Sequence, residues 1–221
     1  MARATERRPA IKETAKDVIL ARIRRAIANA AEPPPIPHDF RERDERDHTA
    51  ILEDFIDRLL DYKAIVTRTD EAGLPQAITD ACQQHSITRL VVPADLPPEW
   101  IPSGVTVLRD DPPLDNTALD ESDGVLTGCA VAIAQTGTII LDGGAYQGRR
   151  ALSLIPDRHL CVVRTEQIVG LVPEAIARLA ERASHPITFI SGPSATSDIE
   201  LIRVEGVHGP RTLQVFVVND R

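Results

Sequence analysis

The sequence predicts an α/β fold, with a mostly parallel sheet flanked by helices and an N-terminal helical arm ahead of it. Two observations carry this prediction. Segments typical of short buried strands alternate with amphipathic helical segments in the first half of the chain, an order that indicates parallel strands joined by right-handed crossovers. The apolar residues are mostly Ile, Leu, Val and Ala, and only seven of the 221 residues are aromatic. Such a composition suits parallel strands covered by helices.

Residues 1–37 are predicted to form the helical arm and a proline-rich hinge. Apolar residues recur at helical spacing on one face over residues 11–30. The proline run over residues 33–37 follows, and proline rings cannot continue a helix. The first 30 residues carry a net charge of +5, so the helix could lie on a membrane or on an acidic partner. Its apolar stripe lacks a Trp or Phe anchor, which favours docking on its own domain or on a neighbouring subunit.

Residues 38–221 are predicted to form one α/β domain, which is long enough to bury a sizeable core. Paired apolar residues at helical spacing predict its first helix, and a proline at the first helical position marks the start of its second. Short runs of Ile, Val and Leu predict its first strands. The expected elements are, in chain order, a helix over 51–60, a strand over 64–67, a helix over 75–82, and strands over 90–92 and 105–108.

A polar stretch over residues 109–123 separates these elements from the second half of the domain. After it, two apolar runs lie only four residues apart, a separation that suits a hairpin or a sharp corner. The expected elements are strands over 131–133, 138–141 and 159–163, a helix within 168–182, a buried strand over 187–190 and a last strand over 213–218.

Charge and cysteine content narrow the function. The net charge is −8, and residues 31–124 alone carry −13, which argues against nucleic acid as a partner. Cys82, Cys129 and Cys161 are isolated, and none of the spacings that bind an iron–sulfur cluster or a structural zinc ion is present. Cys129 and Cys161 lie in apolar runs and are expected to be buried, inert thiols. The sequence therefore predicts no metal site and no cofactor in this chain.

The sequence also predicts a cytoplasmic location. No segment approaches the ~18 consecutive apolar residues of a transmembrane helix. The N-terminus has no apolar signal region, and isolated cysteines suit a reducing compartment. A GxGxxG fingerprint, a Walker lysine and an HExxH pattern are all missing, so no nicotinamide or flavin site is encoded in a recognisable form.

The segment Ser191–Glu200 is the most informative part of the chain for chemistry. It follows an apolar run and reads Ser-Gly-Pro-Ser-Ala-Thr-Ser-Asp-Ile-Glu, so small side chains and hydroxyls stand where a strand ends. Such a loop lets a ligand approach the backbone N–H groups closely. The segment Gly206–Arg211 adds an imidazole and a guanidinium. Together the two segments predict a pocket for an anionic small molecule, and the alternative is a tight turn followed by surface residues.

The chain resembles the lactate-utilisation (LUD) domain family in four motifs that occur in order. These are Gln135–Thr138, Gln147–Arg149, Ser191–Glu200 and Gly206–Arg211. The resemblance runs from about Ile51 to the C-terminus and is densest from Gly128 onward. It implies the fold shared by glucosamine-phosphate deaminases, ribose-phosphate isomerases and CoA transferases. It also implies a part in the oxidation of L-lactate to pyruvate, together with partner subunits that carry iron–sulfur clusters.

The four motifs supply the candidate ligand-binding residues, which are expected to converge on one pocket at the strand ends. Each motif adjoins a predicted buried strand and combines glycine with polar groups, as small-molecule sites do. The candidates are Gln135, Thr136, Gly137, Thr138, Gln147, Gly148, Arg149, Gly192, Ser194, Thr196, Asp198, His208 and Arg211. The alternatives are structural, since Asp198 could cap a helix and the two threonines beside Gly137 could bond the local backbone.

Gln135 stands where the family usually has Glu before the Thr-Gly-Thr. An amide can donate and accept hydrogen bonds, but it cannot act as a base or as a covalent nucleophile. CoA transferases of this fold use a Glu nucleophile, so acyl transfer through a glutamyl thioester is not expected here.

Three functional hypotheses follow. The leading one is a subunit of a bacterial L-lactate utilisation system that contributes ligand binding or assembly rather than electron transfer. The second is a stand-alone enzyme of the same fold that acts on a phosphorylated or CoA-linked small molecule. The third is a non-catalytic interaction module whose glycine motifs are structural. The chain could also assemble as a homo-oligomer.

Overall fold

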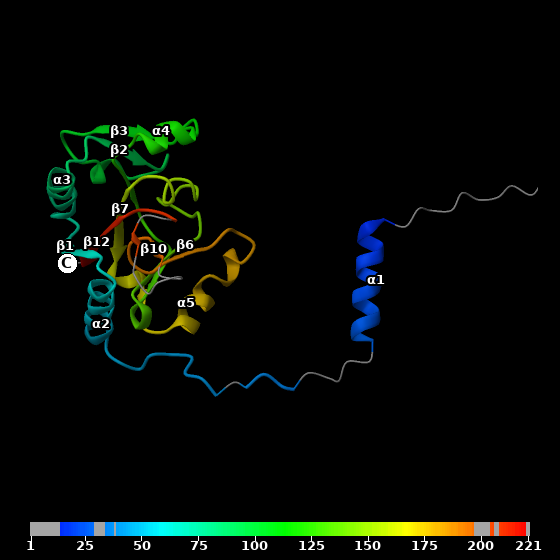
Figure 1. Cartoon of the computed structure of the whole chain (residues 1–221). Coiled ribbons are helices and arrows are strands. Elements are labelled where there is room, and N and C mark those ends of the chain that lie inside the picture. The colour runs from blue at the N-terminus through cyan, green and yellow to red at the C-terminus, as the bar shows by residue number, and fades with distance from the viewer. Residues whose placement is uncertain (1–13, 29–33, 38, 197–203, 206–207, 220–221) are drawn as a thin grey trace, which may run out of the picture. The chain divides into compact units, whose positions relative to one another are not determined.

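The structure is a computed structural model that describes residues 14–28, 34–37, 39–196, 204–205 and 208–219 (Figure 1). The chain divides into two compact units, which are residues 1–40 and residues 41–221. The first unit holds one described helix, and the second holds the sheets and the remaining described helices.

Helix α1 (Ala15–Ile27) is the predicted helix of the arm. Its first turn is closed by a capping box, in which the hydroxyl of Thr14 accepts from the Asp17 amide and the Asp17 carboxylate accepts from the Thr14 amide. Basic residues occupy its last turn, where they complement the helix dipole. α1 buries none of its residues, and the exposed apolar side chains on its surface are Ile19, Ile23 and Ile27.

The second unit is an α/β domain built on a six-stranded parallel sheet, which confirms the predicted fold class. Every pair of neighbouring strands in this sheet is parallel. Its order is β1 (Ile65–Asp70), β12 (Thr212–Asn219), β7 (Arg158–Arg164), β4 (Gly124–Thr127), β2 (Arg89–Val92) and β3 (Thr106–Arg109).

A second sheet of four strands lies beside the first. Its order is β8 (Ile168–Val169), β5 (Val131–Ile133), β6 (Thr138–Leu141) and β9 (Thr188–Ile190). β5 and β6 form the predicted antiparallel hairpin, whereas β8 joins β5 in parallel. A third, two-stranded sheet pairs β10 (Ala195–Thr196) with β11 (Val204–Glu205).

The helices of the second unit are short and cover the two larger sheets. They are α2 (His48–Asp61), α3 (Leu74–Gln84), α4 (Asn116–Asp120) and α5 (Val172–Arg178). Throughout the part of the chain that the structure describes, no helix is both long and apolar enough to cross a membrane.

Alternate residues of the parallel sheet feed two separate cores, because successive side chains of a strand point to opposite faces. In β7, Leu160 and Val162 pack with α3, while Cys161 and Val163 pack with α2 and with the inner face of the second sheet. α5 covers the outer face of the second sheet. The resulting layers are α3, the parallel sheet, α2 with the second sheet, and α5.

β4 and α4 are among the elements of the domain that were not predicted. β4 lies at the centre of the parallel sheet and is buried at all four positions, but its sequence Gly-Val-Leu-Thr holds only two large apolar residues between a glycine and a threonine. α4 has five residues inside the stretch predicted only as polar, and the Asp115 side chain caps it by accepting from the Ala118 amide. In both cases tertiary contacts, rather than a local pattern, define the element.

The prediction of a buried strand over residues 187–190 was wrong in its burial. β9 is an edge strand of the second sheet, and among the described strands it pairs with β6 alone. Phe189 at its centre is 51% exposed. An apolar run does not distinguish a central strand from an edge strand, because that distinction depends on how many neighbours the sheet provides.

Candidate functional site

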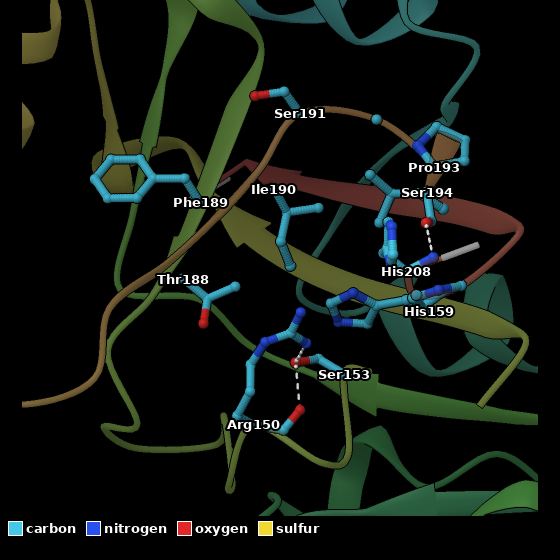
Figure 2. A pocket seen from close by; sticks show the side chains of 14 residues that line it. Arg150, Ser153, His159, Thr188, Phe189, Ile190, Ser191, Pro193, Ser194 and His208 are labelled. Atoms are coloured by element: carbon cyan, nitrogen blue, oxygen red, sulfur yellow. Dashed lines mark hydrogen bonds between the residues drawn. The ribbon is translucent and has the colours of Figure 1, made fainter. Parts of the chain in front are cut away.

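A cavity of about 230 Å³ lies where β9 leads into the Ser-Gly-Pro-Ser loop (Figure 2). We call it the Arg150 cavity. Its lining comprises residues 188–194 and 208–210, together with Arg150, Ser153, His159 and Leu213. His159 and Leu213 are the second residues of β7 and β12, so the cavity lies at the amino ends of these strands. The sequence predicted a pocket beyond the ends of buried strands. Ligands of open parallel sheets generally bind at the carboxyl ends of the strands, so this cavity lies at the opposite end from the usual one.

Arg150 gives the cavity a positive charge. Its guanidinium reaches into the cavity toward the ring of His159 (Figure 2). The guanidinium donates to the hydroxyl of Ser153 at 3.1 Å, and it makes no ion pair with a carboxylate among the residues that the structure describes. Partial burial lowers the pKa of Arg150. The guanidinium is therefore partly desolvated, and no anion of the described chain compensates its charge.

His159 forms the buried wall of the cavity and is 1% exposed. Its Nε2 lies 2.8 Å from the hydroxyl of Thr127 on the neighbouring strand β4. This hydrogen bond holds the ring in place, and the ring in turn faces the Arg150 guanidinium (Figure 2).

The third and fourth sequence motifs meet at the cavity, as predicted for these two motifs. The Ser194 amide donates to the Pro210 carbonyl at 2.8 Å, and the His208 amide donates to the Ser194 hydroxyl at 3.0 Å (Figure 2). Gly192 adopts a positive φ of 83°, and a Cβ there would lie 2.8 Å from the backbone oxygen of Tyr62, just after α2. Only glycine allows the loop to approach the end of α2 this closely.

The first motif contacts the lining of the cavity through a chain of hydroxyl groups. Thr136 and Thr138 bring their hydroxyls within 2.7 Å of each other, and the Thr138 hydroxyl is 2.7 Å from that of Ser191, which lines the cavity. Gly137 between them has a φ of 57°. The Gln135 residue is exposed, and its backbone amide donates to the Gly170 carbonyl. The hydroxyl chain therefore links this motif to the cavity, although none of its residues lines the cavity.

The second motif lies beside the Arg150 cavity rather than in it. Gln147, Gly148 and Arg149 line a neighbouring cavity of about 340 Å³, which shares Arg150, Ser153 and Thr188 with the first. The Gln147 side chain is buried and accepts from the backbone amide of Asp142 at 2.7 Å. The Arg149 guanidinium holds the carboxylate of Asp110 with two hydrogen bonds of 2.8 and 3.0 Å. Both side chains thus have partners within the protein.

The remaining candidates lie at the margins. Thr196 belongs to β10, where it pairs with Val204. Asp198 lies outside the described residues. The Arg211 guanidinium is 3.4 Å from the carboxylate of Asp157, and both side chains are more than half exposed. Arg211 is not part of the lining of the Arg150 cavity.

Replacing Arg211 with alanine is therefore expected to have little effect. An exposed ion pair contributes only about 0–1 kcal/mol to stability, and the Arg211 charge is screened by solvent and paired with Asp157. The melting temperature should stay within about 2 °C of the original value. Thermal unfolding without and with a bound carboxylate measures the effects of the substitution on stability and on carboxylate binding. A loss of carboxylate binding in this variant would place Arg211 in the site.

Arg150, Ser153 and His159 were not predicted from the sequence as site residues. The only local signal was that Arg150 directly follows the second motif, in the order Gln-Gly-Arg-Arg. Which of the two adjacent arginines has a carboxylate partner depends on Asp110, which lies 39 positions from Arg149. His159 belongs to a strong strand pattern, so its burial was predictable but its place in a cavity wall was not.

The buried thiols lie beside this site. Cys129 and Cys161 are both buried and free, as predicted. Hydrogen bonding with Cys129 and the neighbouring His159 lowers the pKa of Cys161 to about 5, whereas the same contact and burial raise the pKa of Cys129. Cys161 is therefore the more acidic thiol of the pair. Within the described residues, no group of three or more His, Cys, Asp or Glu side chains is arranged to hold a metal ion.

Comparison with known proteins identifies the family. The sequence model of the LUD domain matches residues 52–218. The chain is 53% identical over 210 residues to "Lactate utilization protein C" of Deinococcus radiodurans, an alignment that covers 92% of this chain and 95% of that protein. It is 25% identical to the protein of the same name from Bacillus subtilis, over 69% of this chain and 72% of the relative. A crystal structure of a DUF162 family protein from Deinococcus radiodurans matches with 50% identity and a TM-score of 0.69, covering 78% of this chain and 99% of that one. The chain therefore belongs to the LUD domain family.

Proposed function

We propose that this chain is a subunit of a bacterial lactate-utilisation system and that it binds a small carboxylate in the Arg150 cavity. The names of its relatives support the first part, since proteins up to 53% identical to it are called "Lactate utilization protein C". The contents of the cavity support the second part. Ligand binding or assembly, rather than electron transfer, is then the role of this chain.

One observation carries the proposal. The Arg150 guanidinium is partly desolvated and has no carboxylate partner within the described residues, yet it points toward an imidazole and a hydroxyl (Figure 2). A guanidinium presents parallel N–H donors that match the two oxygens of a carboxylate. At about 230 Å³ the cavity is smaller than the ~300–1,000 Å³ pockets of drug-sized ligands. A compact anion such as lactate or pyruvate fits these properties.

The proposal assigns electron transfer to other subunits. The three cysteines of this chain are isolated in sequence, whereas iron–sulfur clusters are held by groups of closely spaced cysteines. Partner subunits with such clusters would accept the electrons of lactate oxidation. The free state of all three thiols suits the reducing conditions of the cytoplasm, which we propose as the location.

Arg150→Gln is the variant that tests the carboxylate site. Glutamine keeps a hydrogen-bond donor but removes the charge, so the affinity for L-lactate or pyruvate should fall by about tenfold or more, in line with the ~1.5–3 kcal/mol of a charged hydrogen bond. Isothermal titration calorimetry on the full chain measures the affinity. Arg211→Ala, which removes an exposed arginine outside the lining, is the matched control and should bind like the original protein.

Two results would contradict this site. One is that neither lactate, pyruvate, acetate nor inorganic phosphate raises the melting temperature of the original protein. The other is that Arg150→Gln and Arg211→Ala bind a carboxylate equally well. A positive result with phosphate alone would redirect the proposal from carboxylates to phosphorylated ligands.

A stand-alone enzyme is the second candidate. It is favoured by the presence of two imidazoles, those of His159 and His208, in the lining of the same cavity, because a pair of titratable groups can supply an acid and a base. Turnover of a phosphorylated or CoA-linked substrate by the purified chain, without partner subunits, would support this alternative over the subunit role.

A further inference from the structure

A second cavity lies at the opposite end of the parallel sheet, at its topological switch point. From β2 the chain continues to β3 on one side, whereas from β4 it returns by way of the second sheet to β7 on the other side, and β2 and β4 are neighbours. In open α/β sheets, ligands bind outside the carboxyl ends of strands at such a point. A cavity of about 400 Å³ is found there, lined by Gly128 after β4, Arg164 at the end of β7, and Trp100 after β2. We call it the Tyr146 cavity.

Tyr146 is held in this cavity in an unfavourable backbone conformation. Its φ is 63°, a left-handed geometry that residues with a Cβ rarely adopt. Two hydrogen bonds maintain it, because the Tyr146 amide donates to the Asp95 carboxylate and the Tyr146 carbonyl accepts from the Gly128 amide, each at 2.8 Å. Glycine would satisfy the same backbone without strain. Strain of this kind, kept in place by surrounding bonds, is a feature of ligand-binding sites.

The strained backbone presents an aromatic ring to the cavity. The Tyr146 ring meets the buried Trp100 ring edge to face, with centroids 5.7 Å apart, and the residue remains 39% exposed. The Tyr146 ring is thus fixed on one side by its contact with Trp100, and its exposed part is available to a ligand. A planar ring can stack on such a wall with little dependence on its identity.

The charges of the cavity favour an anion. Asp142 is neutralised by Arg182 at 3.3 Å, and Arg164 is paired with Glu71. Arg178 donates to the backbone carbonyl of Glu166 at 2.9 Å and forms no ion pair within the described chain. Its guanidinium is therefore the uncompensated charge of this cavity. Gly144 also lines the cavity, and its amide donates to the Asp142 carboxylate at 2.9 Å, which leaves Arg178 as the group for an added anion.

We propose that the Tyr146 cavity binds a planar heterocycle that carries a phosphate, of the mononucleotide class, with its ring on Tyr146 and its phosphate at Arg178. The volume of about 400 Å³ falls within the usual ~300–1,000 Å³ of ligand pockets. This inference goes beyond the carboxylate site, because the two cavities share no lining residue and lie at opposite ends of the strands.

The test is the binding of adenosine monophosphate and riboflavin 5′-phosphate to the full chain, measured by calorimetry. Tyr146→Gly removes the ring but suits the left-handed backbone, so relief of the strain should offset part of the packing lost against Trp100, while the affinity falls by about tenfold. Arg178→Gln should weaken adenosine monophosphate and leave adenosine unaffected. Ser86→Gly is the matched control for strain, since Ser86 also has a positive φ of 54° but lies outside the cavity. It should bind like the original protein.

Two outcomes would overturn the inference. One is that neither nucleotide binds the original protein at millimolar concentration. The other is that Tyr146→Gly binds a nucleotide as tightly as Ser86→Gly does. Arg150→Gln separates this result from the carboxylate site, because it should leave nucleotide binding intact. Loss of nucleotide binding in Arg150→Gln, with retention in Arg178→Gln, would place the nucleotide in the Arg150 cavity instead.

Discussion

Replacing Arg149 with alanine is expected to lower the free energy of unfolding by about 2–3 kcal/mol, without weakening carboxylate binding in the Arg150 cavity. Arg149 donates twice to the carboxylate of Asp110 and also to the carbonyl of Leu114. The Asp110 side chain is only 7% exposed, so the variant would leave a buried carboxylate with the Leu114 amide as its remaining donor. The Arg149 side chain is 37% exposed, and for that reason the expected loss is below the ~3–5 kcal/mol of a fully buried pair. The melting temperature should fall by about 5–10 °C.

The effect should depend on pH in a defined direction. Burial raises the pKa of Asp110, but the hydrogen bonds from Arg149 and Leu114 outweigh it and hold this pKa below its ordinary value. A lowered pKa contributes stability above the ordinary value of about 3.9, and this contribution disappears as the pH falls through the lowered pKa. The stability difference between the original protein and Arg149→Ala should therefore be full at neutral pH and shrink below about pH 4.

A double variant completes this experiment. Asp110→Asn combined with Arg149→Ala removes the buried charge together with its partner, so it should be more stable at neutral pH than Arg149→Ala alone. If Arg149→Ala instead melts like the original protein and loses carboxylate affinity, then Arg149 serves the ligand, as the motif pattern suggested, and the Asp110 pair is dispensable.

The parallel sheet was predictable from sequence because its longest strands are unmistakable. β7 and β12 are continuous runs of buried residues at their centres, as strands covered on both faces must be. β4 is equally buried, but Gly124 and Thr127 leave it only two large apolar residues, and β9 lies at an edge of its sheet. Burial of β4 and exposure of β9 depend on how many neighbouring strands each has, which a short segment of sequence does not reveal.

The candidate site was predictable in its loops but not in its side chains. The third and fourth motifs meet through the hydrogen bonds of Ser194 with Pro210 and His208. Both motifs adjoin strands, so their position at the end of a sheet was predictable. The roles of Arg149 and Arg150 could not be separated, because adjacent residues project in different directions and only the distant Asp110 decides between them. A charged residue near a motif predicts an anion site, but the direction in which its side chain points is known only from the folded structure.

Replacing Gly137 with alanine is expected to lower the free energy of unfolding by about 3 kcal/mol, the largest effect we predict for a single methyl group in this chain. Two contributions add. The φ of 57° is left-handed, and a residue with a Cβ costs about 1–2 kcal/mol there. The new Cβ would also lie 2.7 Å from the Cβ of Arg58 and 3.1 Å from the Leu59 amide nitrogen in α2. Leu59 is fully buried, so α2 cannot move away without opening the core.

Gly143→Ala is the matched control for the backbone contribution. Gly143 has a similar φ of 69°, but nothing lies within 4 Å of the position of its Cβ. It should lose only the ~1–2 kcal/mol of the left-handed geometry, so the difference between the two variants measures the contact of the Gly137 turn with α2. Chemical denaturation of both variants gives the two free energies. Gly137→Ala should also displace the Thr138 hydroxyl from that of Ser191, and carboxylate binding should weaken with it. Equal losses in the two variants would mean that α2 yields to the new methyl group, and the turn would then not be what holds this hydroxyl chain against the cavity.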